Sequence, residues 1–344
     1  MNLFKAKKLI AGDGIGVFAP SVPAHVMFRE KHLMGIRNLE KMGFRVFESD
    51  LLKSRVSQGY RSTSGKERAN EFMEHIANPE IKALIATIGG YNSSSLIPYL
   101  DFKKIRESRK VICGYSDMTS LHLAVLKYSG LSTFYGPAVM ASFGEYPAVP
   151  KVTRDSFLAA VCDAKNYPRQ IVPPTRWSNH FRDAKTNAWK TESRQYVKNK
   201  GWRVLNEGKC KGELLVYNLS TLMSNAGTNH FPDFKNKILL IETASGDMGT
   251  EERLLRHLDL LGVFDRIQGL IVGKPEFFNT LGAPFSHNDL ILEIVGKRDY
   301  PIVTEFDCSH TVPMLTLAQM SRVAIRAEMP NRVDFTVLEA MVVE

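Results

Sequence analysis

The sequence predicts an α/β protein built from two units, each a β-sheet covered by helices. Strand-like and helix-like patterns alternate before residue 166, which is typical of a parallel sheet with covering helices. A second set of apolar runs follows Gly212, and no internal repeat links the two sets. We therefore expect an N-terminal α/β domain over 1–165, a basic connecting segment over 166–212 and a C-terminal α/β domain over 213–344.

The N-terminal domain should be a parallel sheet of the flavodoxin-like kind, and the C-terminal domain a mixed sheet or small barrel. Buried apolar runs predict strands at 14–19, 44–48, 83–88 and 110–113, and later at 213–216, 237–242, 269–273, 301–306 and 322–326. Helical spacing predicts helices over 66–77, 118–128 and 251–261. The last helix should bury one face of leucines, namely Leu254, Leu255, Leu258 and Leu261.

Bulk composition is that of a soluble globular protein, with 44% hydrophobic and 24% charged residues in a chain of 344. Three lysines near the N-terminus are followed by an apolar stretch that Gly12, Asp13 and Gly14 interrupt, so we expect no export signal and a cytoplasmic protein. No apolar run of about 18 residues predicts a membrane span.

Metal and cofactor chemistry find no support in the sequence. The four cysteines lack C-x-x-C spacing and the nine histidines lack an H-E-x-x-H pair, so we expect reduced thiols and no metal site. The glycines at 12, 14 and 16 precede a predicted strand, whereas a dinucleotide-binding fingerprint follows one. We therefore expect no cofactor.

The segment 166–212 carries eleven basic residues and three acidic ones, a formal net charge of +8, together with all three tryptophans. It shows little helical or strand period, which predicts a long loop that is either functional or a solvated linker. The functional interpretation is an aromatic ring stacked on a tryptophan, with a nearby cation facing a phosphate or carboxylate. A nucleic acid polymer is a weaker candidate partner.

Ser116 lies between a predicted strand and a predicted helix, in the sequence VICGYSD (111–117). Such an elbow exposes a serine hydroxyl at the positive end of a helix. The G-x-S-x-G pattern is only half met, because Met118 replaces the second glycine. The alternative is that Ser116 only caps the helix.

A pair of glycines, Gly89 and Gly90, ends another predicted strand and precedes Ser93–Ser95, which we interpret as a helix cap. Since parallel strands end at the same sheet edge, the backbone N–H groups of Gly90 and Asp117 could together form an oxyanion hole. An ordinary strand-to-helix turn is the alternative.

Glu242 and His310 both follow buried runs in the C-terminal half. A carboxylate at the end of an apolar strand needs a partner, and an imidazole held by a carboxylate is the base that a serine nucleophile requires. Each residue alone would more often be structural. Together with Ser116, they make the order Ser, Glu, His.

Several motifs in the right order resemble the LD-carboxypeptidase family of serine peptidases over nearly the whole chain. These are GDGIGVFAPS (12–21), the Gly89–Gly90 turn, GYSD (114–117), NLS (218–220) with GT (227–228), IE (241–242) and SHT (309–311) with Pro313. The resemblance implies a Ser116, Glu242 and His310 triad in which a metal has no part. It also implies two α/β domains and a homodimer.

Residues 90–101 resemble the microcin C immunity branch of that family, which hydrolyses the bond between an aminoacyl or peptidyl group and a modified adenylate. That resemblance implies substrate contacts from Tyr91, Asn92 and either Trp177 or Trp189. Val216–Tyr217 departs from the two glycines that many members have there. Two alternatives remain, a muropeptide LD-carboxypeptidase of cell-wall recycling and a non-enzymatic protein that binds nucleotides or peptides.

Overall fold

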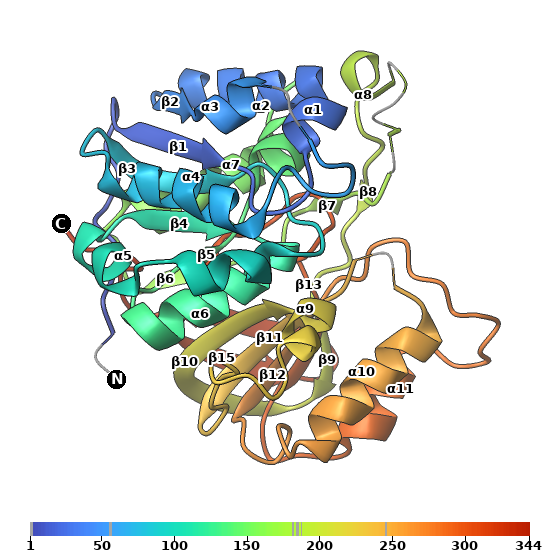
Figure 1. The fold of residues 1–344 in the computed structure, drawn as a ribbon. Helices are drawn as coiled ribbons and strands as arrows, with labels where there is room; N and C mark the ends of the chain where they lie inside the picture. The colour runs from blue at the N-terminus through green and yellow to red at the C-terminus, as the bar shows by residue number, and fades with distance from the viewer. Residues whose placement is uncertain (1–2, 55–56, 181, 184–185, 187, 245) are drawn as a thin grey trace.

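The computed structural model describes residues 3–54, 57–180, 182–183, 186, 188–244 and 246–344. Two large sheets with helices packed against them form the molecule (Figure 1). One sheet is mostly parallel and the other is mixed, so the predicted α/β class is confirmed.

The first sheet has the strand order β14-β5-β4-β3-β1-β2, and the neighbours from β5 to β2 are parallel. The edge strand β14 comes from late in the chain and pairs antiparallel with β5. The predicted strands of this half are present with ends displaced by one or two residues. The bounds are β1 (Gly14–Phe18), β2 (Arg45–Glu48), β3 (Ile81–Ala86), β4 (Val111–Gly114), β5 (Phe134–Tyr135) and β14 (Leu317–Ala318).

Helices cover both faces of this sheet. The apolar sides of α4 (Gly65–Ala77), α5 (Phe102–Ser108) and α6 (Thr119–Ser129) share one core cluster with β3 and β4. The opposite face packs on α2 (Arg29–Lys41) and α7 (Lys151–Cys162). Ser64 and Glu67 cap α4 reciprocally, so it begins at Gly65, one residue before the predicted start.

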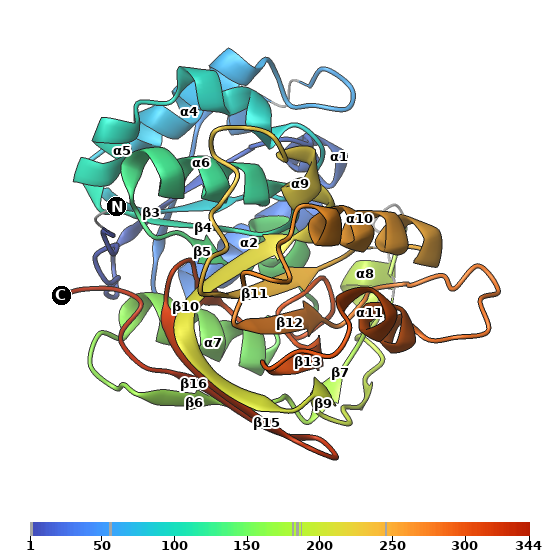
Figure 2. The same ribbon diagram turned by 90° about the horizontal axis from the view of Figure 1, so that it is seen from below.

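The second sheet has the order β6-β16-β15-β10-β11-β12-β13-β9 (Figure 2). Its four central strands, β10 to β13, are parallel, and the flanking ones are antiparallel. Since β6 and β9 are its edges, the described sheet is open and the small-barrel alternative is wrong. The bounds are β6 (Arg169–Ile171), β9 (Arg203–Asn206), β10 (Gly208–Asn218), β11 (Lys237–Glu242), β12 (Gly269–Gly273), β13 (Ile302–Phe306), β15 (Arg322–Glu328) and β16 (Arg332–Val337).

The central strands are apolar without interruption because both of their faces are buried. In β11, Leu240 joins a core cluster shared with the first sheet and α7, whereas Leu239 packs toward the helices of the other face. Those helices are α9 (Leu219–Ser224), α10 (Met248–Leu260) and α11 (His287–Val295). The predicted leucine face of α10 holds for Leu255 and Leu258, but Leu261 follows the helix end and is 39% exposed.

The prediction of a long irregular loop over 166–212 is wrong for much of the segment. It contributes β6, β9 and the first residues of β10 to the second sheet, and a small separate hairpin pairs β7 (Arg176–Trp177) with β8 (Val197–Lys198). Lys209 and Lys211 point outward from β10, so its period of two consists of charged residues alternating with Gly and Cys. An apolar period could not reveal such a strand. The segment also holds α8 (Ala188–Thr191).

The remaining elements are short, and one corrects a prediction. Ser93–Tyr99 forms the 3-10 helix η1, with Asn92 at its N-cap position, in place of a helix capped by Ser93–Ser95. The others are α1 (Ala24–Met27), α3 (Asp50–Ser54), the 3-10 turn η2 (Ser116–Met118) and the single π-helical turn η3 (Val139–Phe143). Within the described ranges, no helix has both the length and the apolar character that crossing a bilayer requires.

Candidate active site

Ser116 lies in a sharp turn between β4 and α6. Tyr115 continues the extended chain, and Ser116 then adopts a φ of 65°. This left-handed value costs a non-glycine residue about 1–2 kcal/mol. Its backbone N–H donates to the hydroxyl of Tyr135 at 3.0 Å, which helps to hold the strained conformation. A strained serine between a strand and the N-terminal end of a helix has the geometry of a nucleophile elbow.

Gly89 borders the Ser116 side chain closely, so that a Cβ atom on it would be in tight contact with its neighbours. A Cβ atom there would lie 3.0 Å from the Ser116 Cβ, 3.1 Å from the Asp117 nitrogen and 3.2 Å from the Ser116 Oγ. Gly90 has a φ of 149°, and a Cβ on it would lie 2.3 Å from atoms of Ser21 and Val22. The missing side chain of Gly89 therefore leaves a small space beside the serine hydroxyl and the Asp117 N–H, whereas Gly90 is required by its contact with Ser21 and Val22.

Hydrogen bonds between Asp117 and Ser93 connect the elbow to η1. The Asp117 carboxylate accepts a hydrogen bond from the Ser93 backbone N–H at 2.9 Å, and the Ser93 hydroxyl donates to the Asp117 carbonyl at 2.5 Å. Burial raises the pKa of Asp117 above its ordinary value, although these hydrogen bonds act in the opposite direction. The side chain of Asp117 thus supports the turn, while its backbone N–H remains next to the serine.

Glu242 ends β11 and is fully buried, yet three of the described side chains donate to its carboxylate. His310 Nδ1 lies 2.6 Å from one carboxylate oxygen. The other oxygen accepts hydrogen bonds from the Tyr135 hydroxyl and, at 3.0 Å, from Asn218 Nδ2. With Nδ1 held by Glu242, the Nε2 atom of His310 is the nitrogen left to exchange a proton.

The charges of Glu242 and His310 stabilise each other. Burial alone would lower the pKa of His310, but the Glu242 carboxylate, its hydrogen bond and the charge of Glu276 outweigh it and raise that pKa above the ordinary value. Burial alone would raise the pKa of Glu242, whereas His310 and the other donors bring it below the ordinary value. Burial and the adjacent Glu242 raise the pKa of Tyr135, so its hydroxyl stays protonated as a donor.

Tyr115 brings the elbow and His310 together. Its ring meets the imidazole edge-on, with centroids 4.7 Å apart. Because Tyr115 immediately precedes Ser116, and Tyr135 links Ser116 to Glu242, the three predicted polar residues gather in one region where the two sheets meet.

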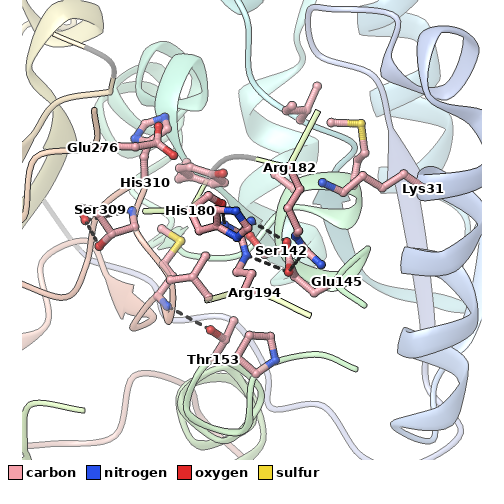
Figure 3. Close-up of a pocket in the computed structure, with 18 of the residues that line it drawn as sticks. Lys31, Ser142, Glu145, Thr153, His180, Arg182, Arg194, Glu276, Ser309 and His310 are labelled. Carbon is pink, nitrogen blue, oxygen red and sulfur yellow. Dashed lines mark hydrogen bonds and ion pairs between the residues drawn. The ribbon is translucent and has the colours of Figure 1, made fainter. Parts of the chain in front are cut away.

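His310 and Tyr115 line a cavity of about 550 Å³, which is large enough for a drug-sized molecule. Figure 3 shows His310 and Glu276 on one side of it and Lys31 and Glu145 on the other. Burial raises the pKa of Glu276. The cavity also has two arginines, Arg182 and Arg194, both paired with Glu145.

The predicted substrate contacts are spread over several places. The side chain of Tyr91 is 83% exposed, and the Asn92 amide oxygen accepts hydrogen bonds from Ser21 and Arg68. Trp189 is only 5% exposed. The ring of Trp177 faces the Lys274 ammonium at 4.8 Å and borders a second cavity of about 490 Å³. The described lining of the His310 cavity includes neither tryptophan.

Sequence reasoning missed the residues that support the site and line its far end. No sequence motif marks Tyr135, because its role arises only when β5 pairs with β4. Asn218 stood in a motif, but its contact with Glu242 depends on the pairing of β10 with β11. Lys31 and Glu145 come from α2 and from the chain after η3, and no spacing in the sequence connects them. Among the described residues, no group of three or more His, Cys, Asp or Glu side chains is arranged so that it could hold a metal ion.

A strained serine beside a buried carboxylate–imidazole pair, on a two-sheet α/β scaffold, defines a serine peptidase. Models of the LD-carboxypeptidase N-terminal and C-terminal domains match residues 15–136 and 211–325. The chain therefore belongs to the LD-carboxypeptidase family of serine peptidases, as the motifs predicted.

Individual relatives lie within the same family. The chain is 36% identical over 327 residues to the microcin C7 self-immunity protein MccF of Escherichia coli, covering 95% of this chain and 94% of MccF. It is 38% identical over 312 residues to a Vibrio cholerae protein provisionally named a carboxypeptidase, covering 90% and 91% of the two chains. A solved structure of MccF with glutamyl sulfamoyl guanosine matches at a TM-score of 0.91 and 34% identity, over 99% of this chain and 100% of that one.

Proposed function

We propose that this protein is a hydrolase of the microcin C immunity kind, which cleaves the amide-like bond between an aminoacyl or peptidyl group and a modified adenylate. Ser116 would be the nucleophile, His310 the general base and Glu242 the carboxylate that orients it. The observation that carries the proposal is the set of contacts that runs from the Ser116 backbone through Tyr135 and Glu242 to His310.

The reaction is an acyl transfer in two halves. His310 Nε2 takes the proton of the Ser116 hydroxyl, and the oxygen attacks the scissile carbonyl carbon. The resulting imidazolium then gives its proton to the departing nitrogen as the bond breaks. A water molecule, activated by the same imidazole, attacks the acyl-enzyme, releases the acid and restores Ser116.

The oxyanion of the tetrahedral intermediate would occupy the space that Gly89 leaves beside Ser116. The backbone N–H groups of Asp117 and Gly90 are the proposed donors. One such donor is typically worth about 3–4 kcal/mol in the transition state. The absence of a side chain on Gly89 supports this placement, because a Cβ atom there would lie 3.2 Å from the Ser116 Oγ and 3.1 Å from the Asp117 nitrogen.

The substrate class is supported by what relatives hold in their structures. MccF has been solved with aspartyl sulfamoyl adenosine, and a mutant of MccF with adenosine monophosphate. Tyr91 and Trp177 both leave part of their rings accessible for stacking on a base, whereas Trp189 is buried. We therefore favour Trp177 over Trp189 as the nucleoside contact, with Tyr91 and Asn92 on the loop after Gly90. We also propose a cytoplasmic homodimer that needs no cofactor, on the family resemblance.

A muropeptide carboxypeptidase is the second candidate. A Bacillus subtilis relative provisionally named a murein peptide carboxypeptidase is 26% identical over 346 residues, covering 99% of this chain. The cations of the cavity would also suit the free carboxylate at the end of such a peptide.

The test is to incubate the protein with an aminoacyl sulfamoyl adenosine and, separately, with an L,D-linked muropeptide tetrapeptide, and to identify products by mass spectrometry. Ser116→Ala is the control for both. Serine-dependent cleavage of the adenosine compound is the expected result. Cleavage of the tetrapeptide alone would establish the second candidate, and cleavage of neither would leave a binding protein on this fold.

A further inference from the structure

Lys31 is a cavity residue that the proposed reaction does not use. It lies on α2 and only 9% of it is exposed. Figure 3 shows its side chain reaching the cavity on the side away from His310 and Glu276. A lysine this deeply buried normally has an anionic partner.

The nearby carboxylate is already occupied. Glu145 accepts hydrogen bonds from Arg182 on one oxygen, and from Arg194 on both oxygens at 2.9 Å and 2.7 Å. The other carboxylates in the described lining of the cavity are those of Asp183 and Glu276, and Glu276 lies near His310. In the described part of the chain, no carboxylate comes within ion-pair distance of the Lys31 ammonium and no hydrogen bond engages it.

The charged form of Lys31 is destabilised while the cavity is empty. Burial lowers the pKa of Lys31; the charge of Glu145 opposes this effect, and the charges of Arg194 and Arg182 add to it. An incoming oxyanion would supply the missing charge and hydrogen-bond acceptor at a lysine of which only 9% is exposed. Within the cavity lining, Lys31 is therefore the cation best placed to gain from a bound anion.

We propose that the Lys31 ammonium binds a carboxylate of the substrate inside this cavity. The identity of the bound compound rests on the proposed function, but the anion site itself does not. Two compounds carry such a carboxylate. One is an acyl sulfamoyl adenosine with an acidic side chain, and the other is an L,D-linked tetrapeptide with a free C-terminus.

Matched pairs of compounds test the site by calorimetry in the Ser116→Ala background, where nothing is cleaved. Aspartyl sulfamoyl adenosine is compared with its asparaginyl analogue, and the tetrapeptide with its C-terminal amide. Lys31→Met keeps the length of the side chain and removes the charge. Lys41→Met, at the exposed end of the same helix, is the matched control.

For one of the two pairs, we expect the carboxylate compound to bind about ten- to a hundredfold more tightly, since one charge-assisted hydrogen bond is lost in the amide. Lys31→Met should abolish that preference, leave amide binding within about twofold and not lower the thermal midpoint. Lys41→Met should change neither. A preference that survives in Lys31→Met, or no preference in either pair, would overturn the proposal. If the unmodified protein cleaves neither substrate while the preference for the carboxylate compound is present, the proposed hydrolase function fails and the anion site stands.

Discussion

Removing the Tyr135 hydroxyl should damage both the stability and the chemistry of the site. Tyr135 is fully buried, and its hydroxyl both accepts from the Ser116 N–H at 3.0 Å and donates to Glu242. In Tyr135→Phe, a hydrogen bond to a charged group worth about 1.5–3 kcal/mol is lost, and a buried N–H left unpaired costs about 1–3 kcal/mol more. We expect the free energy of unfolding to fall by about 3–5 kcal/mol, measured by urea denaturation.

The same variant should change the pH dependence of catalysis. Among the described residues, the carboxylate of Glu242 then keeps only His310 and Asn218 as donors, so it attracts the imidazolium more strongly. The pKa of His310 should therefore rise further, and the acid limb of kcat/KM should move to higher pH. A tenfold or larger loss of kcat is expected as well, because Ser116 loses a contact that holds its strained backbone.

Tyr217 offers a matched control on β10. It is fully buried too, but its hydroxyl has no hydrogen-bond partner among the described residues. Tyr217→Phe should therefore leave both stability and the pH profile unchanged, or stabilise the protein slightly. The reasoning is refuted if the two variants behave alike, or if Tyr135→Phe loses stability without any displacement of the acid limb.

Three further changes probe other parts of the site. Gly89→Ala should lower kcat by about a hundredfold or more in a folded protein, because its methyl group would fill the oxyanion space. Gly249→Ala on α10 is the control: its Cβ would meet no atom within 3.4 Å, so this variant should stay active. His310 acts when neutral and its pKa is raised, so kcat/KM should fall at acidic pH, with a midpoint higher than the pKa of an ordinary histidine. Glu242→Gln should move this midpoint to lower pH, and an unmoved midpoint would contradict the assignment. Trp189→Ala should cost about 3–5 kcal/mol in urea denaturation with little change in KM for an acyl adenosine, whereas a raised KM at unchanged stability would identify Trp189 as a substrate contact.

The sequence predicted those parts of the fold in which local pattern and burial agree. KILLIE and GLIVG are apolar throughout because β11 and β12 are covered on both faces, and their predicted bounds were correct. The strand β10 was only partly predicted, because its first half alternates lysines with small residues near the sheet surface. Its pairing with β15 determines that half, and a single sequence contains no direct signal for such long-range pairing.

The same distinction applies to the site. Ser116, Glu242 and His310 could be proposed because each follows a recognisable apolar run and their chemistry is complementary. Tyr135 and Lys31 could not, since an isolated tyrosine or lysine has many structural uses and only the packing of β5 and α2 gives these two a role. For the tryptophans, an abundance of aromatic residues indicated Trp177 or Trp189 without choosing between them, and only the structure shows that Trp189 is buried.

The three donors to Glu242 come from both sheets, and this links catalysis to the packing of one sheet against the other. Tyr135 belongs to β5 of the first sheet, whereas Asn218 ends β10 and His310 follows β13 of the second. A buried carboxylate with one or two donors removed would be costly, so the ionised pair with His310 can persist only while the sheets are docked. Activity on the identified substrate should therefore disappear over the same urea range as near-ultraviolet circular dichroism. Loss of activity at clearly lower urea, with the dichroism intact, would mean that the pair breaks while the sheets remain packed, and the stabilising role of docking would then be wrong.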